Sequence, residues 1–339
     1  MSAQELRVYT PAGGEWQQRT GNIQYLDSDD HSPGVSLPAR RQPIQGRFEV
    51  TEIPGAMEKM GWHTSAALLN KWFHFSPKNQ ASSVYEKTQG HSEDMSRVYP
   101  ADRLDKQMIR LDWVLSYPRT SAGFNHLQNR LHLTTTPAKR ALISSLYKYR
   151  HTPRIDTLEL SGGDVETLHN AFQFQLVRID TRSLDKASLF LGAMLHHGKP
   201  DDLAGSLGGF SMYAAVAEAK FRPSFIGGID VEITKIAIYI KNPYSFFDDV
   251  AESGSQYLGH WNKDGICLVP EGYVAQWAKF GQWSNYAIQP EGPYGRTFWP
   301  VHNSDFRRWQ DTHDAGGDMV LFSDYRIVKI EPIKFRIGK

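Results

Sequence analysis

The residues best suited to chemistry lie close together near the C-terminal end of the sequence. His313 is followed by Asp318 and then by Asp324. An imidazole that a neighbouring carboxylate orients can act as a general base or acid near neutral pH. The sequence therefore predicts a catalytic pair made of His313 with Asp324 or Asp318.

Basic and aromatic residues surround this pair. Arg307 and Arg308 precede His313 by six and five positions, and guanidinium groups bind phosphate or carboxylate well. Trp309 lies four positions before His313, so a helix would place both on one face. The candidate binding residues of the whole chain are Arg307, Arg308, Trp309, Tyr244 and His260.

Local signals predict the elements that position these groups. Asn303 or Ser304 can cap a helix that carries Asp305 in its first turn and includes Phe306 to His313, because their side chains accept hydrogen bonds from the first backbone N–H groups. Two glycines at 316–317 end it, since glycine adopts the left-handed conformation at little cost. The apolar run 319–323 then predicts a short buried strand.

The same residues have a purely structural interpretation. Phe306 and Trp309 share a helical face with His313, so the histidine can be a half-buried packing residue. Asp318 and Asp324 flank the predicted strand and can serve only to cap turns. Both interpretations remain open at this point.

The single cysteine, Cys267, follows His260 by seven positions and could act with it as a nucleophile and base. Its neighbours are apolar, however, and this favours a small buried side chain. One cysteine excludes an internal disulfide and a multi-cysteine zinc site. His196 and His197 are adjacent and so point apart. The sequence identifies no metal site and no cofactor.

The order of the predicted elements indicates an α+β fold. Helices over 64–73 and from Thr136 onward come early, although a strand is also predicted at 108–117. Strands over 210–221, 231–240 and 327–337 come late, although the alanine-rich segment 210–221 could instead be helical. Regular alternation of strand and helix is lacking, which argues against a doubly wound sheet. We expect a helix-rich N-terminal half packed against an antiparallel, strand-rich C-terminal half.

This pattern divides the chain into an arm and a body. Residues 1–46 are polar and show no sustained period, which predicts an N-terminal arm. Residues 47–339 are expected to form one α+β domain, with a possible internal boundary near 155–165. An aromatic-rich belt at 271–299 predicts packing between elements or a stacking surface.

Composition narrows the classes of partner. The 339 residues carry a net charge of +1 without a basic stripe, which argues against nucleic-acid binding. The longest aliphatic run, near 233–240, is too short to span a bilayer. The first residues lack the apolar core of a secretory signal. We therefore expect synthesis in a cytoplasm and, if the protein is exported, a route without a cleaved signal.

Four segments resemble a bacterial domain family of unknown function that is often encoded beside type VI secretion genes. They are I-P-G-A-M-E-K-M-G-W at 53–62 with the helix end at 71–73, the segment 111–119, the segment 236–261, and F-R-R-W-Q-D-T-H-D-A-G-G-D-M-V-L-F-S-D at 306–324. The resemblance implies a secreted effector toxin that is injected into a bacterial or fungal competitor. It also implies a cognate immunity protein and contacts with the secretion machinery.

A more distant resemblance links the turn at 242–246 to colicin M-type toxins, which use a D-x-Y-D-F motif to cleave a lipid-linked cell-wall precursor. Here Asn242 and Ser245 occupy the two acid positions, around Tyr244. An amide or hydroxyl cannot replace a carboxylate as a general base. Three alternatives accompany the toxin hypothesis: this hydrolysis, disturbance of a membrane without covalent chemistry, and a non-toxic adaptor or binding module. The oligomeric state is not predicted.

Overall fold

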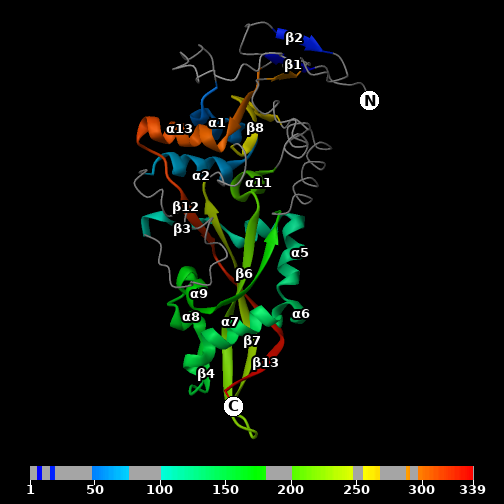
Figure 1. Ribbon diagram of the computed structural model, residues 1–339, viewed down its shortest axis with the longest axis vertical. Helices are drawn as coiled ribbons and strands as arrows, with labels where there is room; N and C mark the ends of the chain where they lie inside the picture. The colour runs from blue at the N-terminus through cyan, green and yellow to red at the C-terminus, as the bar shows by residue number, and fades with distance from the viewer. Residues whose placement is uncertain are drawn as a thin grey trace, which may run out of the picture. The chain divides into compact units, whose positions relative to one another are not determined.

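The computed structural model describes residues 6–9, 16–19, 48–75, 101–180, 201–246, 255–267, 288–290 and 297–338. The chain divides into two compact units. The first unit comprises residues 1–66, 193–199 and 246–313, and the second comprises 67–192, 200–245 and 314–339. The fold is α+β, as the sequence predicts, with helices mainly in the N-terminal half and strands mainly in the C-terminal half (Figure 1).

The first unit contains small sheets and short helices. Strands β11 (Trp299–His302), β8 (Tyr257–Asn262) and β9 (Gly265–Cys267) form one antiparallel sheet in that order. Strands β10 (Ile288–Pro290), β1 (Leu6–Tyr9) and β2 (Trp16–Arg19) form another. The helices are η1 (Val50–Glu52), α1 (Ile53–Lys59) and α13 (Asn303–His313), and α2 (His63–Phe73) begins in this unit.

The second unit is built on one long antiparallel hairpin. Strand β6 (Phe210–Pro223) pairs along its length with β7 (Ile229–Tyr244). The outer edge of β7 is covered first by β12 (Met319–Ser323) and then by β13 (Arg326–Ile337). The outer edge of β6 is covered by β5 (Gln173–Ile179) and then by β4 (Arg154–Asp156). Strand β3 (Leu104–Ile109) adds to β12 in parallel.

Short helices of the second unit lie against this sheet. Helices α5 (Pro118–His126) and α7 (Thr136–Leu146) contact β5, while α8 (Thr157–Leu160) and α9 (Val165–Phe172) contact β6. The alanines of β6, including Ala214, Ala215 and Ala219, are fully buried. Small side chains let a helix approach a strand closely, so an alanine-rich segment can be a strand here. The remaining helical segments are η3 (Ala101–Arg103), α4 (Leu111–Leu115), α6 (Arg130–Leu133), η4 (Tyr147–Tyr149) and α11 (Asp202–Leu207).

The predicted strand at 108–117 is wrong. Strand β3 ends at Ile109, and α4 follows at once. Leu111 and Val114, three positions apart, are both buried, which is the spacing of a helical face, because a strand would bury alternate residues. The backbone N–H of Leu111 donates a 2.6 Å hydrogen bond to the carboxylate of Asp324. This partner from a distant segment fixes the start of the helix, and no local signal reveals it.

Candidate functional site

His313 lies in the last turn of α13, as the sequence predicts, and its side chain is exposed. Its Nδ1 atom is 2.8 Å from the backbone oxygen of Trp309. The imidazole also stacks on the indole of Trp309, with ring centroids 4.6 Å apart and planes 17° apart. One nitrogen of the proposed acid–base group is therefore engaged by its own helix.

The two aspartates hold the structure of the second unit. Asp318 is 3% exposed, and its carboxylate accepts 3.0 Å hydrogen bonds from Trp72 Nε1 and Ser245 Oγ. Asp324 caps α4 through Leu111 and forms a 2.9 Å ion pair with Arg110. His313 belongs to the first unit and both aspartates belong to the second. Their pairing stays a prediction.

The candidate anion-binding arginines have partners within α13 and its surroundings. Arg307 donates to the backbone oxygen of Phe246 and to Gln310 Oε1, each at 3.0 Å. Phe246 also stacks on Phe306 at 3.7 Å. Arg308 is more exposed and pairs with Asp305 at 3.1 Å. Arg307 thus holds a chain segment in place, whereas Arg308 faces solvent.

Tyr244 and its neighbours close the end of β7. Tyr244 is 8% exposed, and burial raises the pKa of its hydroxyl well above the usual range. Asn242 donates to the backbone oxygen of Leu207 at 3.2 Å, and Ser245 donates to Asp318. The two side chains that stand where a colicin M-type motif has carboxylates therefore bind neighbouring segments.

His260 is fully buried in β8, where Nδ1 contacts the hydroxyl of Tyr257. Cys267 ends β9 and lies opposite His260 in the register of the sheet. The side chain of Cys267 lies outside the described part, as do His196, His197 and most of the aromatic belt at 271–299. The hypothesis of a cysteine–histidine pair stays a prediction.

Sequence reasoning missed a histidine in the second unit. His169 of α9 lies with its Nδ1 2.9 Å from the hydroxyl of Tyr239, which is fully buried. The imidazole also makes edge contacts with the rings of Tyr213 and Phe322. Burial, together with the charge of Lys241, lowers the pKa of His169 well below its usual range.

This cluster fixes α9 on the sheet, because a neutral imidazole and a neutral phenol satisfy each other in a poorly solvated place. The register pair Tyr213–Tyr239 across β6 and β7 follows only from the strand pairing. The sequence offers no signal that brings His169 to that pair.

The other feature that sequence reasoning missed is the turn between β6 and β7. Phe225 is 109% exposed and Ile226 is 79% exposed, and we call these two residues the apolar tip. Figure 1 shows the turn at the lower end of the drawing, beside the C-terminus. A pair of large apolar side chains in solvent is uncommon enough to mark a contact surface.

The backbone holds the apolar tip rigidly. Ser224 donates its N–H to Gly228 at 3.0 Å, and Gly227 donates to Ser224 at 3.2 Å. Gly227 and Gly228 have φ values of 89° and 76°, which suit glycine. A Cβ atom on Gly228 would lie 2.6 Å from the carbonyl oxygen of Gly338. In the sequence, this turn was predictable from a proline, two apolar residues and two glycines within positions 223–228.

A second surface feature is an open depression of about 640 Å³. Leu131, which is 82% exposed, lies in its lining, and Arg130 forms an ion pair with Glu331 there. The other lining residues are Gln128, Asn129 and Thr134. The set offers polar and apolar contacts but no histidine, cysteine or serine for nucleophilic chemistry.

Among the described residues, no group of three His, Cys, Asp or Glu side chains is placed to hold a metal ion. Within the same ranges, no helix is long and apolar enough to cross a membrane.

Residues 48–337 match the model of a family described as a family of unknown function, DUF6402. This range includes all four segments that carry the resemblance described above and both predicted catalytic aspartates. No curated protein and no solved structure matches the chain.

Proposed function

The chain belongs to this family of unknown function, and we propose that it is an effector toxin which a type VI secretion system delivers into a bacterial or fungal competitor. We further propose that it acts at the membrane of the recipient cell. An immunity protein in the producer and components of the secretion system would be its partners.

The observation that carries the membrane action is the apolar tip. Leaving a phenylalanine and an isoleucine in water costs roughly 1.5–3 kcal/mol for each side chain compared with burying it. The turn that presents them ends a hairpin whose strands run 14 and 16 residues. Because the hairpin already orders the turn, less conformational entropy is lost when the tip inserts into a bilayer. A toxin gains from this exposure if the tip is buried in the recipient's bilayer.

A catalytic action through His313 is the second candidate. The observation that favours it is the exposure of the imidazole in the last turn of α13; Arg308, five positions earlier on the same helix, is exposed as well. A substrate could reach both groups from solvent. The two candidates predict different residues as essential, so one experiment separates them.

The experiment is inducible expression of the full chain in a bacterium and in yeast, with and without an added export signal. The variants are His313→Ala and the double substitution Phe225→Ser with Ile226→Ser. Leu131→Ser is the matched control, because it removes an exposed apolar side chain outside the hairpin. Circular dichroism and thermal unfolding of each purified variant verify folding.

We expect growth arrest from the wild type, from His313→Ala and from Leu131→Ser, and its loss in the tip variant. Arrest that depends on His313 and not on the tip would replace the membrane action with catalysis. If the wild type arrests growth in no compartment, the toxin proposal is wrong and an adaptor or binding module takes its place.

A further inference from the structure

The end of the β6–β7 hairpin carries an ordered array of charges behind the apolar tip. Residues directly opposite each other on neighbouring antiparallel strands project from the same face of a sheet. In the row nearest the tip, Asp230 of β7 lies between Arg222 of β6 and Arg336 of β13. Each member of this row is exposed.

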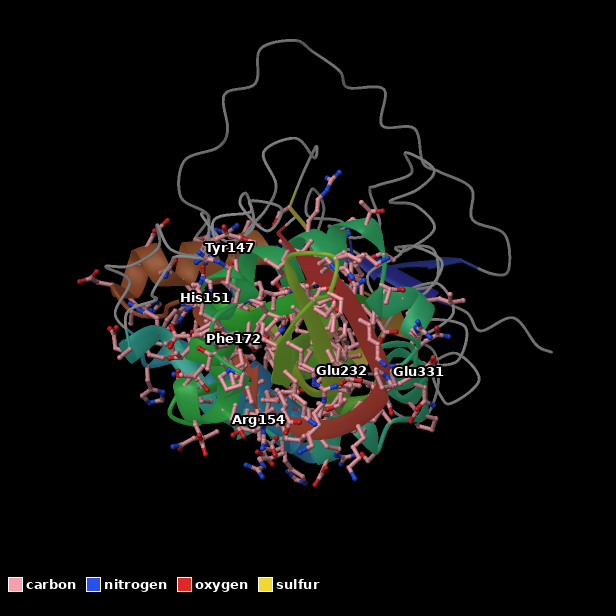
Figure 2. The ribbon with its side chains drawn as sticks, turned by 90° about the horizontal axis from the view of Figure 1, so that it is seen from below. Tyr147, His151, Arg154, Phe172, Glu232 and Glu331 are labelled. Atoms are coloured by element: carbon pink, nitrogen blue, oxygen red, sulfur yellow. The ribbon has the colours of Figure 1, made fainter. Side chains whose placement is uncertain are left out.

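The next row on that face repeats the arrangement. Glu232 of β7 lies between Lys220 of β6 and Lys334 of β13. Figure 2 looks at the molecule from the end where the hairpin turns and labels Glu232 on β7. Both rows therefore place one acid on the middle strand and a base on each side. We call these six residues the charged rows.

The charged rows carry an excess of positive charge. Arg336 pairs with Asp230 at 2.8 Å, and Lys334 pairs with Glu232 at 3.4 Å. Four bases against two acids leave a net charge of +2, although the whole chain has a net charge of only +1. The bond from Arg336 lowers the pKa of Asp230, so this acid stays ionised and keeps its own arginine engaged. Lys220 and Arg222 supply the excess.

Between the rows, the side chains point to the opposite face and are apolar. Phe221 and Val231 lie opposite each other there and are 4% and 1% exposed. The charged face is thus a property of one side of the hairpin, and the apolar tip projects beyond it. A negatively charged bilayer binds a protein surface that presents cations behind an apolar insertion. The apolar side chains then contact the acyl chains while the cations contact the headgroups.

We propose that the apolar tip and the charged rows form a peripheral binding site for anionic phospholipid bilayers, with Phe225 and Ile226 inserted below the headgroups and Lys220 and Arg222 bound to them. This inference rests on the proposed action at a membrane and names the lipid class that is its partner. The site is a docking element and requires no helix to span the bilayer.

Vesicle flotation of the purified full chain tests the site. The probes are vesicles of phosphatidylcholine alone and vesicles that also contain phosphatidylglycerol. We expect binding to the anionic vesicles only, and a decrease with added salt, because salt screens exposed charges. Phe225→Ser should weaken binding by about tenfold or more, since insertion of one large apolar side chain is lost. Phe225→Trp should preserve it, because tryptophan also favours the interface.

Charge variants test the rows separately. Lys220→Gln and Arg222→Gln should each weaken binding to anionic vesicles by roughly fivefold, because each removes one headgroup contact. Leu131→Ser and Lys263→Gln are the matched controls, as they remove an exposed apolar side chain and an exposed cation outside the hairpin. Neither control should change binding.

Several results would overturn the inference. One is equal binding to both kinds of vesicle, and another is loss of binding in Leu131→Ser but not in Phe225→Ser. Absence of binding by a folded wild type would also overturn it. Growth arrest that persists despite such a result would leave the proposed toxicity intact. Tip-dependent vesicle binding without growth arrest would support this site and contradict the toxin proposal.

Discussion

The indole N–H of Trp72 donates a 3.0 Å hydrogen bond to the carboxylate of Asp318, which lies 246 positions further along the chain. Both residues are buried. The backbone continues the contact, because Gly316 donates its N–H to the oxygen of Phe75, and Gly317 donates to the oxygen of Trp72. The glycine pair before Asp318 thus binds one carbonyl group in the last turn of α2 and one just after the helix, where carbonyl groups need partners from outside the helix.

Trp72→Phe should therefore lower the free energy of unfolding by about 2–4 kcal/mol. The substitution leaves a buried carboxylate with one donor fewer and removes part of a large packed ring. Urea unfolding of the two proteins measures the difference. Trp113→Phe is the control, because Trp113 is half-buried and its ring makes an edge contact with Tyr117. Equal effects of the two substitutions would contradict the role of the Trp72–Asp318 bond.

Gly228→Ala should destabilise the hairpin by about 1–3 kcal/mol. The new Cβ would lie 2.6 Å from the oxygen of Gly338 and 2.9 Å from that of Ile337, in a conformation that alanine rarely adopts. Gly208→Ala provides the comparison, because Gly208 also has a positive φ but has nothing within 4 Å of a Cβ. Thermal unfolding should show the larger loss for Gly228→Ala. A larger loss for Gly208→Ala would show that the turn tolerates the crowding.

Arg119 should be strongly coupled to Asp201. Its Nη2 is 2.6 Å from Asp201 Oδ1, its Nη1 contacts the other carboxylate oxygen, and its Nε is 2.8 Å from Asp180. A double-mutant cycle with Arg119→Met and Asp201→Asn should give a coupling energy of about 1–3 kcal/mol, because the pair is bidentate and partly buried.

The same cycle on the pair Arg308 and Asp305 supplies the reference. Arg308 is 66% exposed there, and solvent screens the pair, so the coupling should stay below about 1 kcal/mol. Similar coupling energies in both cycles would mean that the pair of Arg119 and Asp201 stabilises the protein no more than a surface ion pair does.

The stability of the protein should decrease as the pH falls below about 6.5, the usual pKa of histidine. Burial and the charge of Lys241 lower the pKa of His169, so the unfolded chain binds this proton more readily than the folded one. The contribution of His169 to the free energy of unfolding is complete at pH values above its pKa in the unfolded chain. It is lost as the pH falls toward its pKa in the folded protein. Its slope is at most about 1.4 kcal/mol per pH unit for one histidine.

His169→Gln should flatten this part of the profile. Burial and then His126 also lower the pKa of His132, so part of the slope should persist in His169→Gln and decrease further when both histidines are replaced. Urea unfolding from pH 5 to 8 measures the profile. A wild-type stability that is constant over this range would contradict the prediction.

Much of the local structure was predictable because its signals lie within a few residues. The helix at 303–313 and the strand at 319–323 follow from a cap, an apolar period and two glycines, and both are present. The helix that begins at Thr136 and the strands at 210–221 and 231–240 are confirmed in the same way. The α+β fold class follows from the order of such elements.

The segment after Ile109 shows where local signals fail. Its apolar residues fit both a strand and a helix, and a hydrogen bond from Leu111 to Asp324 decides between them. That partner is more than two hundred positions away, so no window of sequence contains the deciding interaction. The His169–Tyr239 contact was missed for the same reason.

The sequence by itself therefore determined the elements, the fold class and the residues capable of chemistry, because propensity, capping and periodicity are local properties. Only the tertiary structure decided what those residues do. It buried Asp318 beneath Trp72, left Phe225 and Ile226 in solvent, and aligned bases on either side of Asp230 and Glu232. Exposure and cross-strand register depend on which segments pack together, and a chain reveals that only when it is folded.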